Sequence, residues 1–189
     1  MLTQLSWRQI RALVLLTAGL SLFTAKAFAG ADAFQPGPVF KDYGHIAKVD
    51  NQQPIPEGMQ FKVVFDTSNA ADAGKVNRHI DSLARFINMH VANGVKPENI
   101  ELALVVHGKG VLDLTQESFY SKRHQGAANV NIPLIKALTE KGVKLYVCGQ
   151  TAAYFDVTPD DLLPGVTMAL SAMTAHAILA KEGYSLNPF

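Results

Sequence analysis

Five short apolar segments along the chain have the pattern of β-strands. Residues 100–106 are apolar at nearly every position, as expected for a strand that other elements cover on both faces. Residues 143–147 form a similar run of apolar and β-branched side chains with one lysine. The predicted strands are residues 60–65, 100–106, 143–147, 166–169 and 184–186.

Helical patterns alternate with these strands. Residues 75–92 predict a helix that is stopped by Asn93-Gly94, and four apolar residues recur on one of its faces: Val76, Ile80, Leu83 and Ile87. Asn131 and Ser171 are suited to begin two further helices. Strands that alternate with helices are typical of an α/β fold with a mostly parallel sheet and helices on both faces.

The first 29 residues have the three parts of a secretory signal peptide. Arg8 and Arg11 precede a 12-residue apolar stretch, and Ala27-Phe28-Ala29 matches a cleavage site. We therefore expect cleavage after Ala29, a periplasmic or secreted location and no stable membrane span afterwards, with an uncleaved signal anchor as the alternative. Residues 30–58, rich in glycine and proline, predict an extended N-terminal arm before a domain at 59–189.

Composition narrows the classes of function. Hydrophobic residues make up 48% of the chain, enough for a well-formed core. Cleavage would change the formal net charge from +1 to −2, which gives no reason to expect nucleic-acid binding. The sequence lacks CxxC and HExxH motifs and the G-x-S-x-G motif of serine hydrolases, so we expect no metal, no cofactor and no serine nucleophile.

Cys148, the only cysteine, is the strongest candidate for chemistry. It follows the strand at 143–147, and we expect Gly149 and Gln150 to form a turn before a helix capped by Thr151. Backbone N–H groups and the positive end of a helix dipole would lower the pKa of a thiol at this position. The alternative is an inert cysteine, because free cysteine is among the most buried residue types.

The loops that follow parallel strands meet at one edge of the sheet, where open α/β folds bind ligands. Those loops are 66–69, 107–110, 148–151 and 170–171. His107 is therefore the candidate partner that stabilises a Cys148 thiolate or exchanges its proton, unless it has a purely structural role. Gly149 would allow close approach to the sulfur, and Gln150 or Thr151 can hydrogen-bond to it. His176, in the middle of a helix among alanines, is interpreted as a packing or interface residue.

Over residues 59–189 the sequence resembles the DsrE/DsrF-like sulfur-relay family, which includes TusD. The resemblance rests on four segments: VVHGKG, VKLYVCGQTAAY, LLPGV and ALSAMTAHAILAKEGY. It implies a three-layer α/β/α sandwich with a five-stranded parallel sheet, and trimers or hexamers. In that family a cysteine after the third strand carries sulfur as a persulfide, and Cys148 matches its position. The relay subunits are cytoplasmic and have small aliphatic residues and arginines after the cysteine, where this chain has Gly149-Gln150-Thr151.

Two classes of function follow from these observations. The first is a sulfur carrier or sulfurtransferase that relays sulfane sulfur on Cys148 between a donor and an acceptor, either of them a protein or a small sulfur compound. The second is a non-catalytic, oligomeric module for ligand binding or assembly in which Cys148 is inert. An accessible thiol surrounded by hydrogen-bond donors would favour the first class, and full burial the second.

Overall fold

A computed structural model describes residues 30–188 of the chain. Contacts divide the chain into two units, Met1–Asp32 and Ala33–Phe189, and the second contains every strand of the described part. The predicted signal peptide, residues 1–29, lies outside the described residues. Between residues 30 and 188, no helix is both long enough and apolar enough to cross a membrane.

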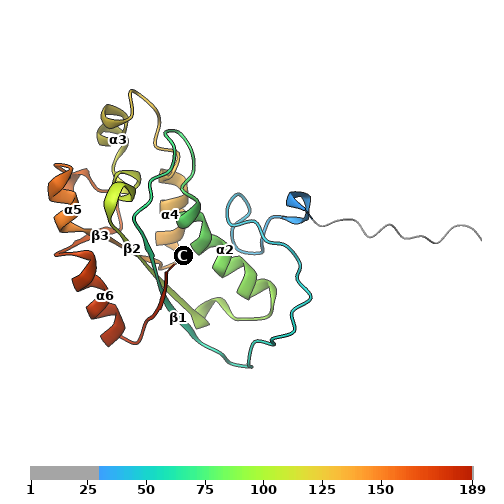
Figure 1. The fold of residues 1–189 in the computed structure, drawn as a ribbon. Coiled ribbons are helices and arrows are strands. Elements are labelled where there is room, and N and C mark those ends of the chain that lie inside the picture. Colours follow the sequence, from blue (N-terminus) through green and yellow to red (C-terminus); the bar gives the residue numbers. More distant parts are fainter. Residues whose placement is uncertain (1–29, 189) are drawn as a thin grey trace, which may run out of the picture. The chain divides into compact units, whose positions relative to one another are not determined.

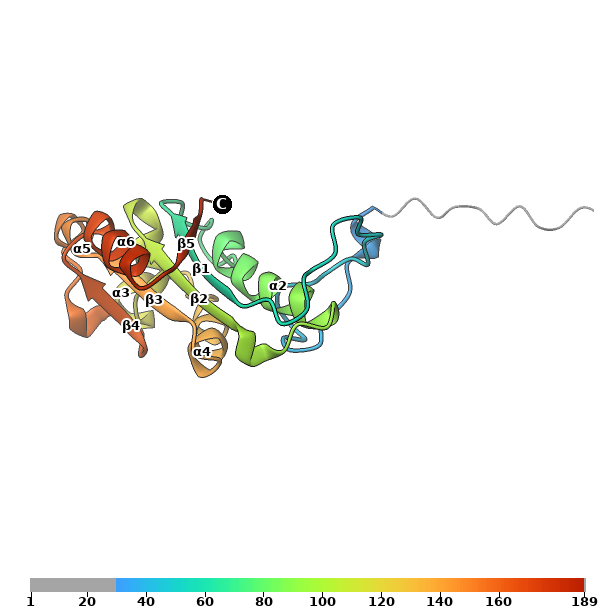
Figure 2. The same ribbon diagram turned by 90° about the horizontal axis from the view of Figure 1, so that it is seen from below.

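The second unit contains one five-stranded sheet in which every strand pairs in parallel (Figures 1 and 2). The strand order is β4-β3-β2-β1-β5. The bounds are β1 Phe61–Thr67, β2 Ile100–Val106, β3 Lys144–Cys148, β4 Val166–Ala169 and β5 Ser185–Asn187. The structure confirms the α/β class and the five-stranded parallel sheet.

Helices connect the strands. The α-helices are α2 Arg78–Ala92, α3 Glu117–Arg123, α4 Ile132–Glu140, α5 Gly149–Tyr154 and α6 Ala172–Lys181. The short 3-10 helices are η1 Ala31–Ala33, η2 Pro97–Asn99, η3 Gly108–Leu114 and η4 Pro159–Asp161. Helix α2 begins three residues later than predicted because the Asn77 side chain accepts the N–H of His79 and caps the helix there. Val76 consequently lies outside the helix and is 41% exposed.

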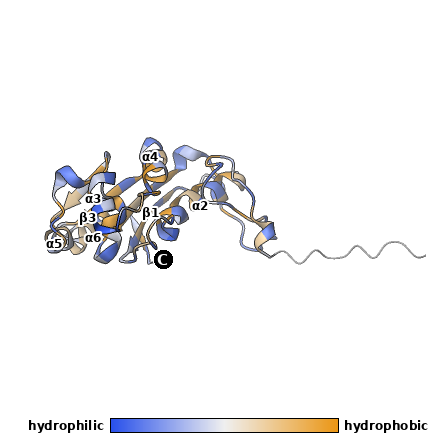
Figure 3. Cartoon of the chain, turned by 90° about the horizontal axis from the view of Figure 1, so that it is seen from above, coloured by the Kyte–Doolittle hydropathy of each residue, from blue (hydrophilic) through white to orange (hydrophobic). Residues whose placement is uncertain are grey.

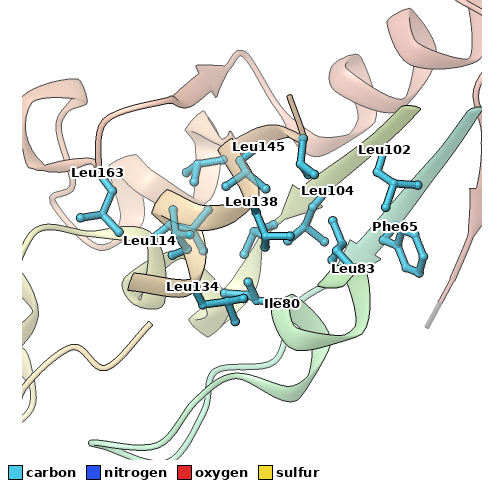
Figure 4. Packing of buried hydrophobic residues seen from close by; sticks show 14 of the residues in the cluster. Phe65, Ile80, Leu83, Leu102, Leu104, Leu114, Leu134, Leu138, Leu145 and Leu163 are labelled. Carbon is cyan, nitrogen blue, oxygen red and sulfur yellow. The ribbon is translucent and has the colours of Figure 1, made fainter. Parts of the chain in front are cut away.

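Two hydrophobic clusters cover the two faces of the sheet. The larger joins β1, β2 and β3 to α2 and α4 through residues such as Phe65, Leu104 and Leu138 (Figure 4). The smaller packs α6 on the opposite face, with Ala175 and Leu179 at its centre. Figure 3 shows that α2 and α4 carry both hydrophobic and hydrophilic residues, as expected for helices that bury one side on the sheet. The result is a three-layer sandwich.

The segment before β1 is held on α2 by one buried side chain. Asn88 accepts the N–H groups of Val39 and Phe40 through its amide oxygen. Its amide nitrogen donates to the carbonyls of Phe40, Tyr43 and Gly44. Phe40 itself is 5% exposed and belongs to the larger hydrophobic cluster. This part of the chain therefore packs on the domain through both backbone hydrogen bonds and an aromatic anchor.

Candidate functional site

Cys148 ends β3 and is also the N-cap residue of α5. The predicted turn at Gly149 and Gln150 is wrong, because α5 begins directly at Gly149 and Thr151 lies inside its first turn. The cysteine retains an extended backbone, with φ −66° and ψ 113°, and is 6% exposed. The strand thus passes into the helix without a loop, and the thiol lies at the junction.

The sulfur of Cys148 is surrounded by hydrogen-bond donors from two helices. Burial raises the pKa of the thiol, but hydrogen bonds from the Thr151 hydroxyl and from the backbone N–H groups of Thr151, Ala172 and Gln150 outweigh it. The net effect is a pKa below its usual value. Ala172 opens α6, so the first turns of both α5 and α6 contribute to stabilising a thiolate.

Gly149 and Gln150 each make a contact at this junction that the sequence did not predict. A Cβ on Gly149 would lie 2.5 Å from the carbonyl oxygen of Ala169. Glycine is therefore required by the close approach of β4, which pairs with β3 at Cys148 and Ala169. The Gln150 side chain donates to the carbonyl of Leu170 at 3.3 Å, and it is its backbone N–H that reaches the sulfur.

His107 follows β2 directly and is the neighbour of Cys148 in the sheet register. Val106 pairs with Val147, so the next residues along the two parallel strands are His107 and Cys148. The ring Nε2 of His107 lies 3.1 Å from Oδ1 of Asp66, at the end of β1. The side chain is 37% exposed. The structure thus brings His107 to the same sheet edge as Cys148 and gives it a carboxylate partner.

Asp66 has a second imidazole partner, which the sequence reasoning missed. Its Oδ2 atom lies 2.7 Å from Nε2 of His176, in the middle of α6. One carboxylate therefore contacts a ring nitrogen of each histidine and joins β1, β2 and α6. The sequence indicated only that residue 66 lies in one of the loops that follow the parallel strands, at the edge where such folds bind ligands.

Three exposed apolar side chains lie at the end of α5 and around the start of α6. Tyr154, at the end of α5, is 81% exposed; Leu170 and Met173, on either side of the start of α6, are 72% and 79% exposed.

Two hollows of about 520 and 680 Å³ lie elsewhere, between residues 33–59 and the carboxyl end of α2, and neither is lined by His107 or Cys148. Among residues 30–188, no group of three histidine, cysteine or acidic residues is arranged to hold a metal ion.

The fold and this edge define a class of protein: a parallel α/β sandwich with a hydrogen-bonded cysteine at the end of its third strand. The model of the DsrE/DsrF-like family matches residues 59–188, and the chain belongs to that family. The family is associated with sulfur relay.

Two solved structures are similar to this chain. MTH1491 from Methanobacterium thermoautotrophicum, described as a protein of unknown function, matches with a TM-score of 0.50 and 20% identity. The ychN protein from E. coli matches with a TM-score of 0.47 and 18% identity. Each match covers 69% of this chain and 100% of the other chain. None of the curated proteins matches.

Proposed function

We propose that this protein binds or relays sulfane sulfur as a persulfide on Cys148. The observation that carries the proposal is the set of donors around the sulfur, which lowers the pKa of the thiol despite its burial. A thiolate is the form that attacks a sulfane sulfur. Membership of a sulfur-relay family supports the same chemistry.

The small exposure of Cys148 restricts the donors that it can accept. At 6% exposed, the residue leaves little room for a bulky group to approach the sulfur. We expect linear species such as polysulfide or a small hydropersulfide to react, whether free or presented by a partner protein. His107 is proposed as the residue that exchanges protons with the reactants, and Gly149, Gln150 and Thr151 as the segment that surrounds the bound sulfur. The protein acts either as a carrier or as a sulfurtransferase.

The test is the intact mass of the folded protein after treatment with polysulfide. The expected result is a gain of one sulfur atom that dithiothreitol removes, and no gain in Cys148→Ser. Absence of the gain in the wild-type protein, with alkylation only after unfolding, would instead support the second function class. The burial of Cys148 is the one observation that favours that class, an assembly module with an inert cysteine.

We further propose that the chain is exported and cleaved after Ala29, and that it works in the periplasm or as a secreted protein. The arginines, the short apolar stretch and the cleavage pattern support export. N-terminal sequencing of the protein recovered from the exported fraction should begin at Gly30. A sequence that begins at Met1 would contradict it.

The protein is also proposed to form a homo-oligomer, a trimer or a hexamer. Members of the family form oligomers, and Tyr154, Leu170 and Met173 expose apolar surface that a monomer leaves in water. Light scattering at micromolar concentration should give a multiple of the monomer mass. A strictly monomeric mass at that concentration would refute self-association.

A further inference from the structure

The contacts of Asp66 determine which nitrogen of each neighbouring histidine carries a proton. An ionised carboxylate only accepts hydrogen bonds. Because Nε2 of His107 and Nε2 of His176 each lie within hydrogen-bond distance of a different Asp66 oxygen, each ring donates from Nε2. In a neutral imidazole with a proton on Nε2, Nδ1 is the atom left to accept a proton.

The same carboxylate is connected to Cys148 by two routes. Through His107 it reaches the residue that neighbours Cys148 in the sheet register. Through His176 it contacts α6 one helical turn after Ala172, whose N–H donates to the cysteine sulfur. Asp66 therefore holds the ring of the residue that lies next to Cys148 in the sheet register, and it contacts the helix whose first N–H donates to the sulfur.

We propose that Asp66 is a positioning residue that holds His107 and His176 as Nε2–H donors. Nδ1 of His107 is then free to accept a proton and to pass it to the thiolate that leaves when Cys148 takes up sulfur. The proposal rests on the proposed function. In the step, the Cys148 thiolate attacks the outer sulfur of a hydropersulfide R–S–SH and forms Cys148–S–SH. The S–S bond of the donor breaks and leaves its electron pair on R–S⁻, which takes from Nδ1 of His107 the proton that the Cys148 thiol had given to that nitrogen when it ionised.

Two reactions of the same thiolate separate this role from simple support of the fold. Alkylation by iodoacetamide releases iodide, which needs no proton, whereas uptake of sulfur from cysteine hydropersulfide releases a thiolate. In Asp66→Asn and in His107→Gln, the rate of sulfur uptake should fall by about tenfold or more relative to the rate of alkylation at the same pH. Asp160→Asn, which changes an exposed carboxylate in η4, should leave both rates unchanged.

A second readout follows the protons directly. An asparagine side chain offers one acceptor and one donor group, so in Asp66→Asn only one of the two histidines can continue to donate from Nε2. Nitrogen-15 NMR should show both rings as Nε2–H tautomers in the wild type and one as Nδ1–H in the variant.

Each possible outcome separates the two proposals. If the wild type takes up no sulfur, the proposed function fails. If the wild type takes up sulfur, two results would refute the role of Asp66 in proton transfer and leave the sulfur-carrier function standing. In the first, both variants take up sulfur at the wild-type rate. In the second, sulfur uptake and alkylation fall by the same factor. Unchanged tautomers in Asp66→Asn would overturn the positioning role even if that variant were less stable.

Discussion

The hydroxyl of Thr151 offers the sharpest test of why the Cys148 thiol ionises. Thr151→Val removes the side-chain donor to the sulfur but keeps the shape of the residue and its backbone N–H. A hydrogen bond to a charged group contributes about 1.5–3 kcal/mol. Its loss should lower the ratio of thiolate to thiol at a fixed pH by about tenfold or more. The midpoint of iodoacetamide alkylation against pH should move upward in the folded variant.

The control for this test is Thr167→Val, which makes the same change on the exposed side of β4. Its alkylation profile should match that of the wild type. Because burial acts against ionisation, the thiol of Thr151→Val should approach or exceed the pKa of an ordinary cysteine. An unchanged midpoint in Thr151→Val, with melting temperature preserved, would show that the backbone donors alone set the pKa and would refute the reasoning.

Three further outcomes test the fold and its stability. Asn88→Ala should lower the free energy of unfolding by about 3 kcal/mol, measured by urea denaturation, because several buried backbone groups of residues 39–44 lose their partner. Gly149→Ala should reduce both the melting temperature and the alkylation rate, since its Cβ would meet the Ala169 carbonyl. The hydrogen bond from Tyr184 lowers the pKa of Glu101 in the folded protein. The ionised Glu101 therefore adds to the free energy of unfolding above about pH 4.5, and this contribution is lost as the pH falls through the pKa of Glu101 in the folded state. In Glu101→Gln, the melting temperature should fall less steeply than in the wild type as the pH is lowered below about 4.5.

Much of the fold followed from the sequence because its signals are local. The apolar run of β2 and the positions of Asn131 and Ser171 predicted element boundaries that the structure reproduces, although only the Ser171 side chain caps its helix. Cys148 was assigned to the end of a strand for the same reason. The turn after it was predicted incorrectly because glycine usually ends regular structure, whereas Gly149 here begins α5 to make room for a neighbouring strand.

The partners of the site could not be read from local patterns. Asp66 and His176 are 110 positions apart, and nothing in the alanine-rich surroundings of His176 marks it as more than a packing residue. The contribution of Ala172 was equally hidden, because it is made by a backbone N–H that every residue except proline possesses. Contacts of this kind depend on the strand order, which alternating strands and helices leave open.

The strand order explains why the two histidines and the cysteine meet. From β1 to β4 the chain moves across the sheet in one direction, with α2 and α4 on one face, and it then returns from β4 to β5 beyond β1. A right-handed connection that reverses direction must cross on the opposite face, which is where α6 packs. On that path the start of α6 passes the end of β3, and its middle reaches the end of β1. The reversal therefore brings the Ala172 N–H to Cys148 and the His176 ring to Asp66, so one topological feature supplies both the thiolate donor and the carboxylate-bridged histidines.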